Sequence, residues 1–307
     1  MKTFYELTRR NIKLFFKDKG MFFTSLITPA ILLVLYVTFL GNVYRDSFCS
    51  SFPEGLSISD SLTDGLVCGE LVSSLLAVSC VTVAFCSNFL MVQDKANGVI
   101  NDLLVSPVKP SALSLSYYFA NLTTTLAVCF VATAICLIYT ASVGWYMSAV
   151  DTFLLLLDVV IIVLFGSALS SVVNFFLSTQ GQISAVGTII SSGYGFICGA
   201  YMPLSSFSEG LRHVVSFLPG TYGTSLMRLH AMRGAIGEME KEGLPSEVAS
   251  GIMSSLDCNV SFFDHVVSEE GSYIIICAST LALLGACILL NIAASRKKSP
   301  RTRGLKR

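Results

Sequence analysis

Six long runs of apolar residues, separated by short polar stretches, constrain this chain more than any other feature of its sequence. A helix needs about 20 consecutive, mostly apolar residues to cross a bilayer core, and each run approaches or exceeds that length. Only 13% of the 307 residues are charged, whereas soluble domains carry about 25%. We therefore predict an all-α membrane protein with six transmembrane helices. The predicted spans are residues 21–41, 66–91, 112–141, 149–177, 183–201 and 273–294.

The first 20 residues are basic and amphipathic, with Arg9, Arg10 and Lys13 set among apolar side chains. A helix of this kind lies in the headgroup plane, with its apolar face toward the lipid and its cations beside phosphate. A cleaved signal peptide does not fit, because the apolar run that follows has the length of a span and lacks a small-residue cleavage site. We predict an interfacial helix over residues 1–20.

Between the fifth and the sixth span the pattern changes. Residues 202–234 are about half apolar and are broken by Pro203, Pro219 and Gly220, so one continuous helix does not fit them. Two short helices, near 204–217 and 221–232, would form a re-entrant hairpin that dips into the membrane and returns. Irregular backbone at that depth requires cover from protein or water. Residues 235–271 are acidic and polar, which predicts an exposed extracellular segment.

The basic residues are unevenly distributed among the segments that flank the spans. Six Lys and Arg precede the first span and seven follow the last one, whereas the loop at 43–66 has one. Because cytoplasmic segments are enriched in Lys and Arg, both termini are predicted to be cytoplasmic, and six crossings satisfy that arrangement. The segment at 92–111 then faces the cytosol, the hairpin faces outward, and residues 295–307 form a basic cytosolic tail. The expected location is the cell (plasma) membrane.

The cytosolic segment at 92–111 has the pattern of a short amphipathic helix. Its apolar residues recur at helical spacing, and Pro107 and Pro110 stop the helix because proline disfavours helical geometry in the residue before it. A compact helix of this kind is suited to binding a protein outside the membrane, although an ordinary polar loop fits the pattern equally well. The apolar positions are Val92, Ala96, Val99, Ile100, Leu103 and Leu104, and the polar ones are Gln93, Asp94, Lys95, Asn101 and Asp102.

Asp158 lies within the fourth span, roughly 10 Å from its outer end by helical rise. A carboxylate at this depth is costly and is a candidate for a role in transport. Alternatively, it reaches the interface, is protonated, or bonds to Asn, Ser or Thr on a neighbouring helix. The spans offer no Lys or Arg as its partner. His213, His230 and His265 have no ligand spacing and are interpreted as ordinary surface or interface residues.

Small residues recur every four positions in the fifth span, which permits close backbone contact with another helix. Both a dimer seam (or the wall of a translocation path) and packing within the chain fit this stripe. Its members are Gly187, Ser191, Gly195 and Gly199.

Several further motifs bear on chemistry. Cys49, Cys68 and Cys258 fall in or near predicted outer segments, and a disulfide between two of them stays open because pairing cannot be deduced from sequence. No CxxC pair or His-rich tract occurs, so no metal site is expected. The sequence also lacks the GxxxxGK[ST], GxSxG and HExxH motifs. We therefore expect that the chain is not an enzyme and does not bind nucleotide phosphates in the usual way.

Two stretches resemble the membrane subunits of ABC-2-type transporters. Asn97–Val108 (NGVINDLLVSPV) follows the second span and is similar to that family's cytosolic coupling segment. Ile197–Leu204 (ICGAYMPL), followed by Phe217–Tyr222 (FLPGTY), is similar to its outward re-entrant hairpin. With the six spans and the basic termini, the resemblance covers nearly the whole chain. The long outer segment at 235–270 departs from the family's short outer loops, which makes a glycan exporter a poorer fit.

The resemblance implies a permease subunit that holds no cofactor and works with a separate ATP-binding cassette subunit, which carries ATP and Mg. A second permease copy, identical or related, would complete the pore in the lipid bilayer, and no nucleic acid is involved. The cargo is expected to be amphiphilic, such as a drug, a peptide or a lipid-like molecule, and to move outward. Export of a polysaccharide or glycolipid, or proton-coupled transport through Asp158, is the alternative. Coupling is implied at Gln93, Asp94, Lys95, Asn97, Asp102 and Leu103, and an outer gate at Tyr201, Pro203, Pro219 and Tyr222.

Overall fold

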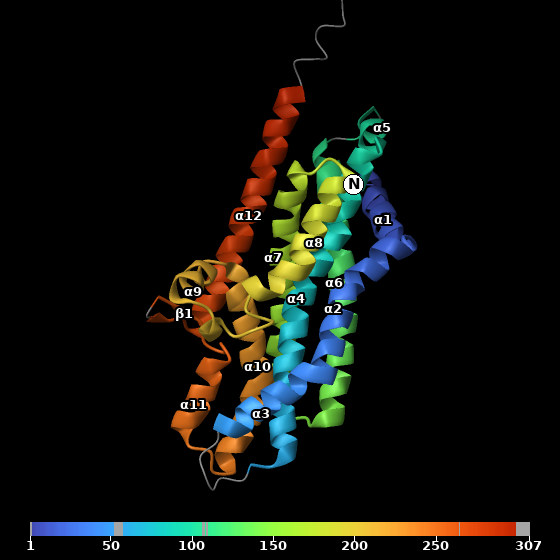
Figure 1. The fold of residues 1–307 in the computed structure, drawn as a ribbon. Coiled ribbons are helices and arrows are strands. Elements are labelled where there is room, and N and C mark those ends of the chain that lie inside the picture. Colours follow the sequence, from blue (N-terminus) through green and yellow to red (C-terminus); the bar gives the residue numbers. More distant parts are fainter. Residues whose placement is uncertain (1, 52–57, 106–107, 109, 264, 299–307) are drawn as a thin grey trace, which may run out of the picture.

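The computed structural model describes residues 2–51, 58–105, 108, 110–263 and 265–298, and these are almost entirely helical (Figure 1). The only strands among them, β1 (Ser261–Phe262) and β2 (His265–Val266), form a small antiparallel hairpin. The helices are α1 (Lys2–Lys17), α2 (Lys19–Leu35), the π-helix η1 (Tyr36–Leu40), α3 (Gly41–Ser51), α4 (Asp60–Ala96), α5 (Val99–Val105), α6 (Pro110–Val143), α7 (Ala149–Phe176), α8 (Gln180–Ile197), the 3-10 helix η2 (Leu204–Ser206), α9 (Glu209–Ser216), α10 (Pro219–Lys241), α11 (Ser246–Ser255) and α12 (Glu269–Lys298).

Among the described residues, five helical stretches are long and apolar enough to cross a membrane. They are Lys19–Ser50, Asp60–Ala96, Ser111–Val143, Ala149–Phe176 and Glu269–Ala293. The protein is therefore an all-α membrane protein, as predicted. The predicted fifth span falls on α8, which is not one of the five. With 18 residues, α8 is about 27 Å long, and it is rich in Gly, Ser and Gln. The count of six crossings therefore stays a prediction.

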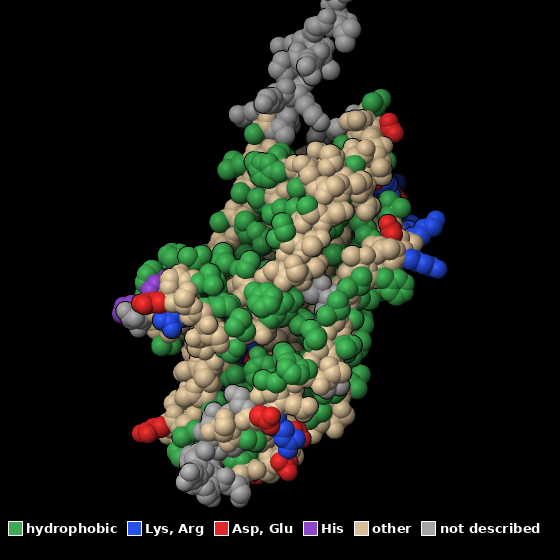
Figure 2. Space-filling model, in the orientation of Figure 1, with side chains coloured by type: hydrophobic (Ala, Val, Ile, Leu, Met, Phe, Trp, Pro, Cys, Tyr) green, Lys and Arg blue, Asp and Glu red, His purple; other side chains and the backbone are tan. Residues whose placement is uncertain are grey.

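The central helix of the bundle is α4, which packs against α2, α6, α7, α8 and α10 (Figure 1). In its most apolar window 89% of the residues are buried, compared with 11% for α12. Small residues allow this close packing: a Cβ added at Gly69 would lie 2.9 Å from the carbonyl oxygen of Ala231 on α10. The surrounding helices direct apolar side chains outward instead, for example Phe23, Val131 and Leu281. In Figure 2 hydrophobic side chains spread over the body, whereas charged ones gather near α1, on the α9 lobe and at the lower end.

The first outer loop differs from the prediction. Residues 41–51 are helical, as α3, and α4 already begins at Asp60. The polar residues that favoured a loop are paired, since Arg45 donates to Asp60 and Asp64 at 2.6 and 2.7 Å. Part of the predicted loop (residues 52–57), Pro107, and the tail from residue 299 onward lie outside the described residues.

The predicted hairpin also differs in its second helix. The return helix α10 begins at Pro219 and runs to Lys241, well past the predicted end at residue 232, and it is buried along most of its length. Its C-terminal half packs with α3, the start of α4, and α11 in a second hydrophobic core. That core includes Phe48, Leu62, Leu66, Met232, Ile236, Met239, Leu244, Ile252 and Leu256. Residues 235–271, predicted as one exposed segment, thus contain buried helix.

Two glycines on α10 give a matched test of this packing. A Cβ at Gly234 would overlap the carbonyl oxygen of Tyr146 and lie 2.8 Å from its carbonyl carbon, whereas at Gly237 nothing lies within 4 Å. We expect Gly234→Ala to destabilise the fold by about 1–3 kcal/mol through overpacking. Gly237→Ala should be neutral or stabilising by up to about 1 kcal/mol, because alanine favours helix. Thermal melts of the purified variants measure this difference, and equal melting temperatures would contradict the placement of α10.

Candidate transport machinery at the two ends of the bundle

At the end of the bundle near α1, Asp94 joins three helices. It lies on the last turns of α4 and is only 6% exposed. Its Oδ2 accepts hydrogen bonds from Arg10 Nη1 of α1 at 2.9 Å and from the Tyr117 hydroxyl of α6 at 2.5 Å. A predicted contact for an external protein is therefore used inside the chain, where it holds α1 against α4 and α6.

Lys95 makes a similar connection to α7. Its Nζ donates to the carbonyl oxygens of Asn174, Phe175 and Leu177 at 3.2, 3.0 and 3.3 Å. These carbonyls lie at the C-terminal end of α7, where the helix dipole favours a cation, and the Asn174 oxygen also accepts from the Leu177 amide at 3.2 Å. Lys95 thus ties the end of α4 to the end of α7.

The coupling segment contains a break that periodicity did not reveal. The predicted continuous helix ends at Ala96, and α5 restarts at Val99. Between them the backbone of Gly98 adopts φ of +79°, a value that residues other than glycine rarely adopt. Among the predicted coupling residues, Asn97 and Asp102 are exposed, and Gln93, Lys95 and Leu103 are partly buried.

Sequence reasoning missed one residue of this surface. Val105, at the end of α5, is 89% exposed, the highest value among the large hydrophobic side chains that the structure describes. It falls outside the helical periodicity of Val99, Ile100 and Leu103. The available signal was its position at the end of a short amphipathic helix, directly before the Ser106-Pro107 break in the sequence.

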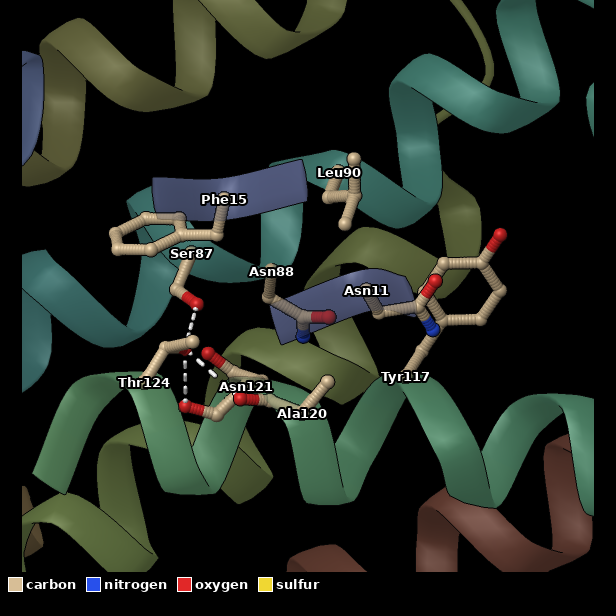
Figure 3. Close-up of a pocket in the computed structure, with 9 residues that line it drawn as sticks. All are labelled: Asn11, Phe15, Ser87, Asn88, Leu90, Tyr117, Ala120, Asn121 and Thr124. Carbon is tan, nitrogen blue, oxygen red and sulfur yellow. Dashed lines mark hydrogen bonds between the residues drawn. The ribbon is translucent and has the colours of Figure 1, made fainter. Parts of the chain in front are cut away.

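A small polar cavity of about 10 Å³ lies beneath α1, between α4 and α6 (Figure 3). Asn11 comes from α1, and the facing polar groups come from α4 and α6. The cavity has room for about one water molecule, so an amphiphilic molecule does not fit in it. Its lining is Asn11, Phe15, Ser87, Asn88, Leu90, Tyr117, Ala120, Asn121 and Thr124.

The residues implied as an outer gate lie around the entrance to α10. The Tyr201 ring covers Gly195, where an added Cβ would overlap it, and stands edge-on to Phe196 with the ring centroids 5.0 Å apart. Pro203 precedes η2, and Pro219 is the first residue of α10. The buried Tyr222 donates its hydroxyl to the carbonyl oxygen of Ser216 at 2.7 Å. The residues implied as a gate are thus held by contacts with the end of α8 and within the hairpin itself.

The predicted small-residue stripe of α8 faces the chain's own side chains. A Cβ at Gly187 would lie 3.4 Å from the Phe89 ring of α4, and Gly195 is covered by Tyr201. Gly199 has φ of +74° and ends the helix rather than continuing the stripe. Ser191 is partly buried. These positions contribute to packing inside one chain.

A buried arginine, which the sequence reasoning did not single out, fixes the hairpin to α4. Arg228 of α10 pairs with Glu70 of α4 at 2.7 Å, and both side chains are 1% exposed. Its guanidinium also donates to the carbonyl oxygens of Gly199 and Leu256 at 2.7 and 3.0 Å, on either side of the hairpin. Asp257 lies 3.5 Å away and accepts from the Leu204 amide at 2.5 Å.

Burial raises the pKa of Asp257 to about 6, although the nearby guanidinium opposes that shift. The signal for this cluster was available in the sequence. Glu70 interrupts an apolar run and Arg228 interrupts the hairpin, and charges inside membrane segments occur mostly in pairs.

Asp158 has a partner, which corrects the sequence interpretation. Its Oδ2 lies 2.6 Å from Nδ1 of His230, and its Oδ1 accepts from the Tyr273 hydroxyl at 2.7 Å. His230 is fully buried rather than a surface histidine, and its Nε2 lies 3.1 Å from Glu269 of α12. Asp158 therefore neither reaches the interface nor relies on neighbouring Asn, Ser or Thr.

The ionic cluster continues along α10 through Arg233, about one turn after His230. Its Nε donates to Asp151 of α7 at 2.9 Å, and its Nη1 lies 3.8 Å from Glu269.

The open question of a disulfide also has a structural answer, because Cys49, Cys68 and Cys258 are free thiols in the described residues. Cys68 instead lies 3.5 Å from the Thr140 hydroxyl.

Comparison with known proteins assigns the chain to a family. The sequence profile described as ABC-2 type transporter matches residues 2–230, a range that runs from α1 to the middle of α10. It therefore includes Asp94 and Lys95, the whole of α5, and both Arg228 and His230. No curated protein matches the sequence. The chain belongs to the ABC-2 type transporter family, as a membrane-spanning permease of an ABC transporter.

Proposed function

We propose that this permease exports an amphiphilic molecule, such as a drug, a peptide or a lipid-like compound, using ATP hydrolysed by a separate subunit. The observation that carries the proposal is the exposed corner formed by Asn97, α5 and Val105. A soluble protein that binds this corner can act on α4 directly, because α4 ends one residue before the corner begins. The chain itself then needs neither nucleotide nor metal, since ATP and Mg belong to the partner subunit.

The packing of α4 supports a route for the mechanical step. Asp94 and Lys95 tie the end of α4 to α1, α6 and α7, so a displacement at α5 reaches three neighbours at once. At the far end, Glu70 ties the same helix to α10 of the outer hairpin. ATP acts in such a system only by favouring one arrangement of the helices over another. In this proposal α4 transmits the displacement from the coupling corner, formed by Asn97 and α5, to the outer gate.

The size of the interior supports a pore shared between two copies. The cavity beneath α1 measures about 10 Å³, and the core of α4 is closely packed on several sides. A larger hollow of about 290 Å³ is lined by residues of α1 alone and does not enter the bundle. Binding sites for drug-sized molecules measure about 300–1,000 Å³. We infer that cargo passes between this chain and a second permease copy, identical or related, in the plasma membrane. The coupling corner and both termini would lie on the cytoplasmic side, with the hairpin outside, as the distribution of Lys and Arg favours.

The direct test is affinity purification of the tagged chain in mild detergent, followed by mass spectrometry and an ATPase assay. The expected result is co-purification of an ATP-binding subunit with vanadate-sensitive ATPase activity. The matched control replaces Val105 with Asp, which leaves the buried contacts untouched and should release the subunit. A folded, ATPase-free preparation from native membranes would contradict the proposal and direct attention to proton-coupled transport through the Asp158 cluster.

A further inference from the structure

The return helix of the hairpin, α10, is held by cations on two opposite faces. Arg228 and His230 are two residues apart, which places them about 200° apart around a helix of 3.6 residues per turn. Arg228 faces Glu70 of α4, whereas His230 faces Asp158 of α7 and Glu269 of α12. Both cationic side chains are buried, at 1% and 0% exposure. The helix therefore lies between two separate ionic contacts.

The two contacts differ in chemistry. A guanidinium stays charged at every pH at which proteins fold, so the Arg228 contact is permanent. An imidazole is different, because its neutral form has one N–H and its cation has two. Both ring nitrogens of His230 face carboxylate oxygens, at 2.6 and 3.1 Å. Only the imidazolium can donate to both, so this contact depends on a proton.

The surroundings of His230 favour that proton. Burial lowers its pKa, but the hydrogen bonds and charges of Asp158 and Glu269 outweigh the burial and raise the pKa above its ordinary value. The titratable and charged groups around it are Asp158 from α7, Glu269 and Tyr273 from α12, and Arg233 from its own helix. Arg233 pairs with Glu269 and Asp151, so Glu269 is shared between the two cations.

We propose that His230 is a positioning residue whose imidazolium holds α10 against α7 and α12, so that loss of its proton releases this face while Arg228 keeps the other face on α4. We call the contact of His230 with Asp158 and Glu269 the clamp, and it is a property of the fold. Its consequence for transport, a change in the opening of the outer gate, rests on the proposed function. The hairpin would then move together with α4, the helix that also carries the coupling corner.

The direction of the pH dependence follows from the raised pKa. The ionic contact is fully present below the ordinary pKa of histidine, about 6.5, and is lost as pH rises through the higher value that His230 has in the folded chain. The clamp is therefore closed at pH below about 6.5 and opens as the pH rises through the raised pKa of His230.

The first part of the test reads the proton directly, using the full chain in lipid nanodiscs. The chain has three histidines, and the variant His213→Gln/His265→Gln leaves His230 as the last one. In ¹⁵N-histidine-labelled protein, both ring nitrogens of His230 should carry protons at pH about 6.5, and one of these protons should be lost as the pH is raised. A neutral ring at pH about 6.5 or below, in this variant and in the unsubstituted chain, would overturn the proposal.

The second part measures the release by electron paramagnetic resonance, with genetically encoded spin labels on exposed positions. Label pairs at Glu240 with Leu281, and at Glu240 with Ser61, report α10 against α12 and against α4. With rising pH the first distance distribution should shift or broaden while the second stays constant. His230→Gln, a neutral side chain, should give the released distribution at every pH. A first distance that is unchanged by pH and by His230→Gln would overturn the clamp, whether or not the chain proves to be an exporter.

Discussion

Replacing Arg228 with methionine is expected to destabilise the protein by about 3–5 kcal/mol, because the substitution leaves the buried carboxylate of Glu70 without its counter-ion. The arginine also donates to the carbonyl oxygens of Gly199 and Leu256 and lies beside Asp257. Its loss therefore loosens both flanks of the hairpin. A fall in the apparent melting temperature of the detergent-purified protein measures this effect, with proteolysis expected to begin near the hairpin.

The matched control removes the charge on both partners. In the double variant Glu70→Gln/Arg228→Met no carboxylate remains buried at the α4 position, so most of the lost stability should return. Glu70→Gln alone should cost less than Arg228→Met, because the cation keeps Asp257 and two carbonyl oxygens as partners. A double variant as unstable as Arg228→Met would show that the ion pair is not the source of the effect.

Breaking α5 with Asp102→Pro is expected to lower transport and the stimulation of the partner's ATPase about tenfold or more, equivalent to about 1.4 kcal/mol of lost coupling. Proline at this position removes the amide that bonds to the carbonyl oxygen of Gly98 and disrupts the helix. The side chain of Asp102 is exposed, so membrane insertion and expression should not change. Both rates are measured in proteoliposomes that contain the purified complex.

Two further variants separate the helix from its charge. Asp102→Ala removes the carboxylate but keeps the helix, and it should retain most of the coupling. Val99→Pro is also expected to be mild, because Val99 is the first residue of α5 and proline is well tolerated at the first helical position. Normal coupling in Asp102→Pro would remove α5 from the mechanism.

The sequence and the structure agree best where a pattern refers to one helix at a time. The fourth span was predicted at 149–177, and α7 runs from Ala149 to Phe176, with Ser148 and Asp151 forming a capping box at its start. The second and third predicted spans lie within α4 and α6, and both helices continue past the apolar run at each end. At the two ends of α4, the polar residues Asp64, Asp94 and Lys95 are paired with other helices.

The predictions diverged where a backbone conformation or a distant partner decides. The break at Gly98 depends on a positive φ, and helical spacing carries no information about it. The partner of Asp158 is 72 residues away along the chain, and that of Glu70 is 158 residues away. Both partners lie on α10. The sequence prediction underestimated the length and burial of this helix, because the prolines and glycines near its N-terminus resemble a loop.

The sequence by itself determined that this chain is a helical membrane protein, because the length and composition of an apolar run decide its place in a bilayer whatever its neighbours are. The match to the ABC-2 type transporter family is also a property of the sequence alone. Only the tertiary structure decided which charges are paired, that Asp94 and Lys95 face inward, and that α10 lies between a permanent and a titratable cation. These features depend on which faces of distant helices meet, and the free energy of a buried charge is set by the groups within a few ångströms of it.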